Sequence, residues 1–185
     1  MLIDTEELVP QYIHKIYSAI VNGHFINENS NRGGYAQLYK VIDENEVALR
    51  AYFKPLGYIL IRRAGYFYFA SENALEKRSM LDLMVDYIEI VDFFKTLDSN
   101  FGVDYRFTIS SIENRLSSGN MELEDIVSKM KRSKSQNNRD FIQKIIDKLK
   151  KNGFVEEQDA IKGEYLVLNS YDYIETLLKE VEIYE

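Results

Sequence analysis

Two segments of this chain follow the same order: short helices run into a glycine, and two short strands then return on each other. In the first segment Gly57 precedes the strand Tyr58–Arg63, and Ala64-Gly65 turns the chain into Tyr66–Phe69. β-Branched and aromatic residues dominate both strands, as is typical of a β-hairpin. In the second segment a polar loop ending at Gly163 joins two further strands. The pattern predicts that a unit of short helices followed by a β-hairpin occurs twice in the chain.

The residues before the first hairpin supply the other elements of a winged-helix module. A first helix, with Asp4 and Glu7 as a capping box, carries apolar residues at every fourth position and ends at Gly23. We expect a short strand at His24–Asn27 and helices at about Tyr35–Ile42 and Glu44–Lys54, the last ending at Pro55. Helix, short strand, two helices and hairpin is the winged-helix order.

The residues after the first hairpin repeat this order. Asn73 and Glu76 form a second capping box, which opens a long helix at about 74–99. The elements expected next are a strand at Tyr105–Thr108, a helix capped by Ser110 and Glu113, helices at Met121–Lys131 and Ser135–Asn152, the second hairpin (Phe154–Glu157 and Glu164–Leu168) and a final helix at Ser170–Ile183. We therefore predict an α+β fold, mostly α with small β-hairpins. It has two tandem winged-helix domains, 1–72 and 73–185, connected by the helix at about 74–99. The hairpins do not align as similar sequence, so only the order of elements repeats.

Composition excludes several classes of protein. The chain has 185 residues, of which 45% are hydrophobic, enough for one ordinary core or two small ones. It has no cysteine, so disulfides and thiolate metal sites are excluded. No apolar run approaches the roughly 20 residues that a membrane helix needs. The acidic N-terminus does not resemble a signal peptide, and we expect a cytoplasmic protein without membrane contact.

Enzymatic function is disfavoured. The sequence contains no GxxxxGK[ST], GxGxxG, HExxH or GxSxG pattern, so the common phosphate, zinc and nucleophile sites are missing. Its two histidines have structural explanations, His14 beside an apolar stripe and His24 at a helix end. We predict no catalytic residue, no cofactor and no metal.

Basic residues concentrate in residues 129–151, which carry a net charge of +7 and leave −14 for the rest of the chain. The candidate contacts to DNA phosphate in this segment are Lys129, Lys131, Arg132, Lys134, Arg139 and Lys144. Such a surface suits weak, sequence-independent contact with the duplex backbone. The alternative is a solvated helix face whose C-terminal lysines answer the helix dipole. Both interpretations remain open.

The presumed recognition helices argue against sequence-specific DNA reading. The third helix of the first domain begins Asp43-Glu44-Asn45-Glu46, and carboxylates there repel phosphate. In the second domain, with Phe141, Ile145 and Leu149 facing the core, two carboxylates fall near the centre of the outward face. At the first hairpin Arg62 and Arg63 remain candidate phosphate contacts.

Aromatic residues favour protein partners instead. The chain holds 14 Tyr and 10 Phe, and tyrosine is enriched at interface cores. Tyr66 and Tyr68 project from one face of the first hairpin, and Phe67 and Phe69 from the other. One face packs on the domain and the other is available for docking, unless helices cover both faces. The candidate partner or dimer contacts are Tyr58, Tyr66, Tyr68, Arg62 and Arg63.

Over about residues 20–70 the chain resembles the MukE/MksE family, the small tandem winged-helix subunits of bacterial condensin-like SMC complexes. The matching stretches are Asn22–Asn27, Tyr35–Leu38, Tyr52–Leu60 and Gly65–Phe69. Beyond them only length and the order of elements agree.

The resemblance implies a homodimer that binds the kleisin subunit and, through it, regulates an SMC ATPase that this chain does not contain. The expected role is chromosome organisation and segregation, or plasmid defence in related SMC systems, with weak non-specific DNA contact and a nucleoid-associated location. The alternative is a winged-helix transcription regulator that binds an operator through residues 129–151. An enzyme of unrecognised type is a third, weaker hypothesis.

Overall fold

The computed structural model describes residues 10–71, 76–130 and 137–182, in two compact units, Met1–Glu76 and Lys77–Glu185. Each unit is described by itself. The predicted domain junction after residue 72, and the predicted caps at Asp4 and Asn73, fall outside the described residues.

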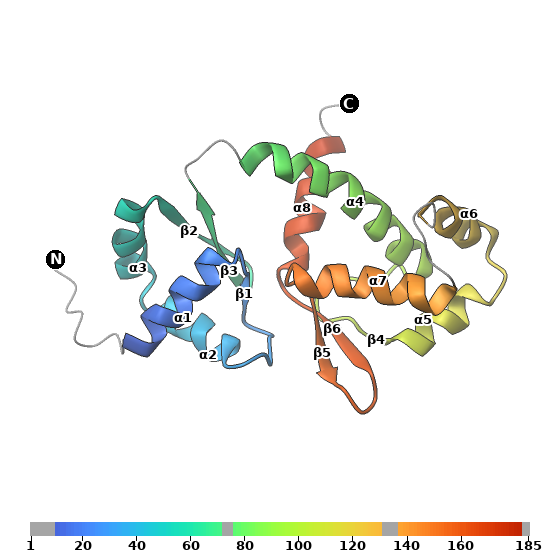
Figure 1. The fold of residues 1–185 in the computed structure, drawn as a ribbon, viewed down its shortest axis with the longest axis horizontal. Coiled ribbons are helices and arrows are strands. Elements are labelled where there is room, and N and C mark those ends of the chain that lie inside the picture. Colours follow the sequence, from blue (N-terminus) through green and yellow to red (C-terminus); the bar gives the residue numbers. More distant parts are fainter. Residues whose placement is uncertain (1–9, 72–75, 131–136, 183–185) are drawn as a thin grey trace. The chain divides into compact units, whose positions relative to one another are not determined.

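The first unit consists of three helices and a three-stranded antiparallel sheet (Figure 1). Its elements are α1 (Pro10–Val21), β1 (Ile26–Asn27), α2 (Tyr35–Glu44), α3 (Glu46–Phe53), the 3-10 turn η1 (Lys54–Leu56), β2 (Tyr58–Arg63) and β3 (Tyr66–Ser71). The strand order is β1-β3-β2, with Ile26 opposite Phe67 and Arg63 opposite Tyr66. Gly57 adopts φ 81°, a conformation that favours glycine, and so separates η1 from β2.

The core of the first unit lies between the helices and one face of the sheet. Ile16 of α1, Leu49 and Phe53 of α3, and Leu60 and Phe67 of the hairpin have at most 1% of their surface exposed. The ring of Phe53 contacts that of Phe69 edge to face, with centroids 5.3 Å apart. Burial of these apolar side chains against one face of the sheet stabilises the first unit.

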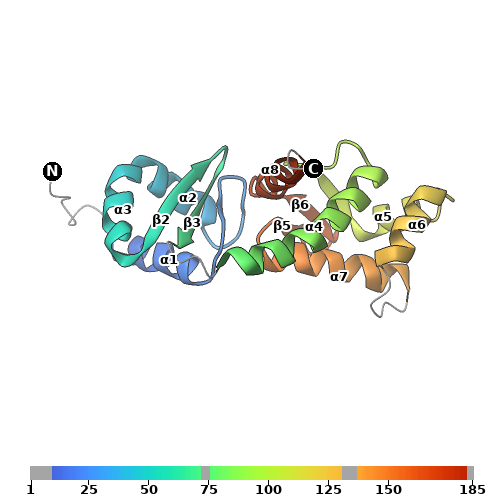
Figure 2. The ribbon, with the colours of Figure 1, turned by 90° about the horizontal axis from the view of Figure 1, so that it is seen from above.

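The second unit repeats the order with additional helices (Figure 2). Its elements are α4 (Glu76–Leu97), β4 (Arg106–Thr108), α5 (Ile109–Leu116), α6 (Met121–Met130), α7 (Asn138–Lys151), β5 (Val155–Asp159), β6 (Glu164–Val167) and α8 (Tyr171–Glu182). Its strand order is β4-β6-β5, again antiparallel. Compared with the first unit, α6 is an extra helix between β4 and the wing, and α8 follows the wing.

Aromatic rings form the core of the second unit. Phe94 of α4 stacks on Phe101 with centroids 4.1 Å apart, and Phe93 meets Phe141 of α7 edge to face at 5.6 Å. Tyr171 at the start of α8 packs edge to face on Phe101 and is fully buried, and this burial raises the pKa of its phenol. These contacts hold α4, α7 and α8 together around the sheet.

The predicted α+β class with tandem winged-helix units is confirmed. The predicted cap of α5 is wrong, because Thr108 rather than Ser110 is the N-cap. The Thr108 Oγ1 accepts a hydrogen bond from the Ser111 N–H at 3.1 Å, and the Ser111 Oγ accepts one from the Thr108 N–H at 3.2 Å. Ser111, at the third helical position, takes the place of the glutamate that is usual there in a capping box.

Candidate partner and nucleic-acid surfaces

Arg62 lies against carboxylates at the start of α3. Its guanidinium is 2.6 Å from Asp43 Oδ1 and 2.9 Å from Glu46 Oε2, and Arg50 pairs with the same Glu46 at 2.7 Å. The hydrogen bond from Arg62 lowers the pKa of the Glu46 carboxyl. The guanidinium of Arg62, which we predicted to contact phosphate, thus binds carboxylates of its own unit instead. Arg63 is exposed and has no ion pair within the described residues.

The aromatic hairpin is more buried than the sequence predicts. Tyr66 has no exposed surface, and its ring meets Phe25 edge to face with centroids 5.8 Å apart. Tyr66 therefore does not present its ring to a partner, contrary to expectation. Tyr58 and Tyr68 are half-buried, and Tyr68 also lies against Phe25, at 5.7 Å. Tyr66 and Phe67 point to opposite faces of the hairpin, and both are buried. At these two positions the hairpin is therefore covered on both sides, which was the alternative interpretation of the sequence.

Three of the six predicted phosphate contacts in the second unit carry ion pairs. Lys129 pairs with Asp125 at 2.6 Å, Arg139 with Glu113 at 3.0 Å, and Lys144 with Asp140 at 2.8 Å. All three basic side chains are more than half exposed, so these pairs are weak and a phosphate can compete for the cation. Lys131, Arg132 and Lys134 lie outside the described residues.

The outward face of α7 is mixed in charge. Phe141, Ile145 and Leu149 are buried as predicted, together with Ile142 and Ile146. On the outside, the Gln143 amide donates to Asp147 at 2.9 Å. An acidic residue tied to its neighbour at the centre of this face does not suit base reading, which needs side chains aimed at base edges.

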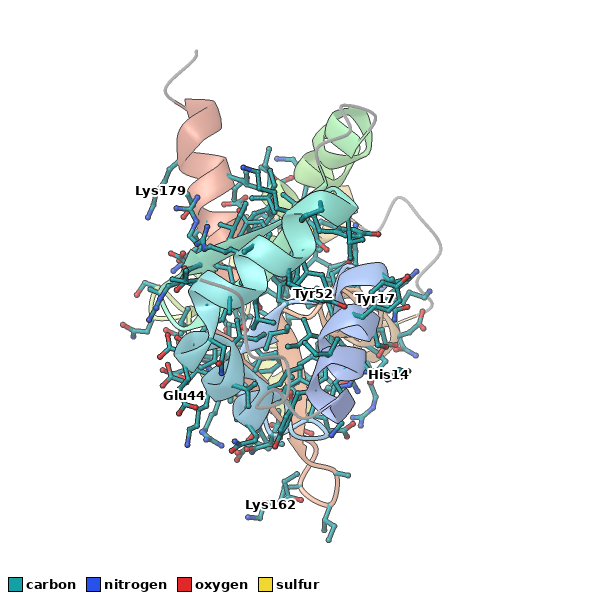
Figure 3. All side chains as sticks on the ribbon, turned by 90° about the vertical axis from the view of Figure 1, so that its left-hand side faces the viewer. His14, Tyr17, Glu44, Tyr52, Lys162 and Lys179 are labelled. Carbon is teal, nitrogen blue, oxygen red and sulfur yellow. The ribbon has the colours of Figure 1, made fainter. Side chains whose placement is uncertain are left out.

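An exposed apolar surface that the sequence analysis missed lies on the first unit. We call it the α1–α3 face: Tyr17 and Val21 on α1, Tyr52 on α3 and Leu56 on η1, exposed by 50, 57, 45 and 55%. Figure 3 shows Tyr17 and Tyr52 near each other on the same side of the unit. The sequence did contain a sign of this surface. Tyr17 and Val21 are four residues apart and form a second apolar row on α1, beside the row that contains Ile16.

Two further kinds of site were sought in the part of the chain that the structure describes. There, no three His, Asp or Glu side chains are grouped closely enough to bind a metal ion. Within the same residues, none of the helices is both long and apolar enough to traverse a bilayer.

The two units, each with helices followed by a three-stranded antiparallel sheet, define a protein of the tandem winged-helix class. The family model of the condensin complex protein MksE matches residues 11–178. The chain therefore belongs to the MksE family and is a subunit of a condensin-like complex. No curated protein matches it in sequence.

Proposed function

We propose that this chain is a non-catalytic subunit that binds the kleisin of its condensin-like complex and thereby regulates an SMC ATPase. The observation that carries the proposal is the family match over residues 11–178, which spans both winged-helix units. A homodimer, a place on the nucleoid and a role in chromosome segregation or plasmid defence are parts of the same proposal.

The α1–α3 face is the first candidate for the kleisin contact. Its two tyrosines, Tyr17 and Tyr52, are each about half exposed and lie near each other, and tyrosine is enriched at protein interfaces. The outer face of the first hairpin, with Tyr68 and Arg63, is the second candidate; Tyr58 lies on the opposite face and packs against the core.

Co-purification with the kleisin and SMC proteins of the same operon tests the proposal. We expect a stable complex that survives gel filtration. The pairs of substitutions Tyr17→Ala with Tyr52→Ala, and Tyr68→Ala with Arg63→Ala, then identify which surface binds, because only the pair on the binding surface weakens the complex. Failure of the wild-type chain to bind that kleisin contradicts the proposal.

DNA contact is proposed as an accessory function of the second unit. The exposed cations Lys129, Arg139 and Lys144, with Lys131, Arg132 and Lys134, are suited to backbone contact. Replacing Lys131, Arg132, Lys134 and Arg139 by glutamine should weaken duplex binding equally for all sequences and reduce its salt dependence. A transcription regulator would instead show a strong preference for one operator.

A further inference from the structure

The two helices that directly precede the wings, α3 and α7, expose different kinds of side chain. Every apolar residue of α7 is buried, and its exposed positions hold Asn138, Arg139, Lys144, Asp147 and Lys151. The exposed positions of α3 hold Val47, Arg50, Ala51 and Tyr52. Both helices bury their other side in their own unit, so packing within the unit does not explain why only α3 is apolar on the outside.

The exposed apolar residues of α3 form one continuous surface. Val47 is 84% exposed, at a position where a solvated helix normally carries a polar side chain. Ala51 follows it by four residues and therefore lies in the same row, which we call the α3 outer row. Tyr52 lies about 100° around the helix from Ala51 and joins this row to the α1–α3 face. The helix faces the viewer in Figure 3, with Tyr52 labelled.

The side chains in the middle of α3 are small. Ala48 and Ala51 stand between Val47 and Tyr52, and all but Ala48 are exposed. One helix packs on another by placing its side chains between those of its neighbour, and small residues at the contact bring the two axes closer. A partner helix therefore fits this surface, whereas an extended partner needs the free backbone groups of a sheet edge.

The charges beside the row indicate the chemistry of the partner helix. Glu46 is held by Arg50 at 2.7 Å and by Arg62 at 2.9 Å, so these charges are matched within the unit. Lys54, directly after α3, is exposed and forms no ion pair with the residues that the structure describes. The neighbouring helix α1 contains no carboxylate. The exposed Glu44 lies before the other end of α3, so a partner's carboxylate is favoured only at the Lys54 end.

We propose that an amphipathic helix of the kleisin packs along the α3 outer row, with its apolar side chains on Val47, Ala51 and Tyr52 and a carboxylate against Lys54. The inference rests on the proposed kleisin binding and adds the chemistry and the direction of the bound segment. Duplex DNA fits this row poorly, because the valine offers no hydrogen bond to a base edge and Glu44 repels phosphate.

Two substitutions on the row test the apolar contact in the full chain, with the kleisin of the same operon as the probe. Val47→Ala should weaken the complex by about fivefold through lost apolar contact. Ala51→Gln fills the space that the partner helix occupies and should weaken it by about tenfold. Thermal unfolding should be unchanged in both variants, because both positions are exposed and alanine and glutamine favour a helix. Met121→Ala, at an 83% exposed position of the second unit, is the matched control and should bind as wild type.

Reversal of one charge tests the direction of the helix. Lys54→Glu should weaken the complex, and replacing a carboxylate of the kleisin helix by lysine should restore it. Lys40→Glu reverses another exposed cation of the first unit, on α2, and should leave the affinity unchanged. A loss in Lys54→Glu that no such kleisin variant restores contradicts the proposed direction.

The remaining outcomes separate this inference from the proposed function. Wild-type affinity in Val47→Ala and Ala51→Gln overturns the inference and leaves kleisin binding intact. A change in the oligomeric state of the free chain in these variants, with kleisin affinity unchanged, assigns the row to a second copy and also overturns it. Failure of the wild-type chain to bind the kleisin contradicts the proposed function and this inference with it.

Discussion

Arg62, at the end of β2, donates a hydrogen bond to Glu46, in the first turn of α3, over 2.9 Å. The same guanidinium reaches Asp43 and lies 5.7 Å from the ring of Phe67. One side chain thus ties the wing to the junction of α2 and α3. The pairing gives the acidic start of the helix a structural role and removes Arg62 from the cations available to a ligand.

Replacing Arg62 should loosen the first unit, because Asp43 loses its ion pair and Glu46 keeps only the one with Arg50. We expect Arg62→Ala to lower the thermal midpoint by about 2–4 °C. Arg63→Ala, at the neighbouring exposed position, is the control and should leave the midpoint unchanged. Calorimetry of both variants measures the difference, and equal midpoints would show that the ion pairs contribute nothing.

Asp98 makes stability depend on pH in the acid range. Its carboxylate accepts hydrogen bonds from the Tyr105 hydroxyl at 2.6 Å, the Asn100 N–H at 3.0 Å and Arg115 at 2.7 Å, and these bonds lower its pKa to about 2. Because the folded pKa lies below the unfolded value, the stabilisation is complete above the unfolded pKa and is lost as the pH falls toward 2. Asp98→Asn should cost about 2 kcal/mol at pH 7.

Urea denaturation between pH 7 and pH 3 checks this expectation. The difference between wild type and Asp98→Asn should stay constant down to about pH 5 and then shrink. Glu122→Gln, which changes an exposed carboxylate on α6, is the control. A difference that is independent of pH would contradict the role given to the Asp98 charge.

Thr108 should matter more than Ser110 for the stability of α5. Thr108→Ala removes the side-chain acceptor of the N-cap and should cost about 1 kcal/mol. Ser110→Ala removes an exposed hydroxyl inside the helix and should change stability by less than half of that. Chemical denaturation of the two variants decides between the two caps, and the reverse order would restore the assignment to Ser110.

Substitutions at two adjacent residues of α3 should distinguish an effect on stability from an effect on kleisin binding. Phe53, 1% exposed, lies in the core, whereas its neighbour Tyr52 is on the α1–α3 face. Phe53→Ala should cost about 3–5 kcal/mol of stability. Tyr52→Ala should cost less than about 1 kcal/mol and weaken the kleisin complex by about tenfold or more. Unchanged kleisin affinity in Tyr52→Ala would rule out the α1–α3 face as the binding surface.

Glu113 should restrain DNA binding through its ion pair with Arg139. Glu113→Gln frees a guanidinium at the start of α7, so we expect tighter duplex binding and a salt dependence steeper by about one phosphate contact. Arg139→Gln should not tighten binding, and the double variant should resemble Arg139→Gln alone. Fluorescence anisotropy at several salt concentrations measures all three.

Most of the fold could be predicted from sequence because its signals are local. Apolar spacing, a proline and glycines at element ends indicate the described helices and both hairpins to within a few residues. The cap at Thr108 could not be predicted, because Ser110 with Glu113 offers an equally good local pattern. Only the tertiary packing of β4 decides between the two.

Surface properties were less predictable than elements. The alternation of residues in a strand assigns Tyr66 and Phe67 to opposite faces, but it does not say that both faces are buried. The pairing of Arg62 with Glu46, or of Arg139 with Glu113, joins residues distant in sequence. The α1–α3 face likewise arises only when two helices lie together.

The two sheets differ in when they can form during synthesis. The first closes once Phe67 can meet Ile26, so the first unit has all its strands as soon as residue 71 has emerged from the ribosome. The second pairs Arg106 with Leu166, and β4 therefore waits for nearly the whole second unit to emerge. Non-local pairing of this kind is slow. The strands of the first sheet are thus all available before β6, the central strand of the second sheet, has been synthesised.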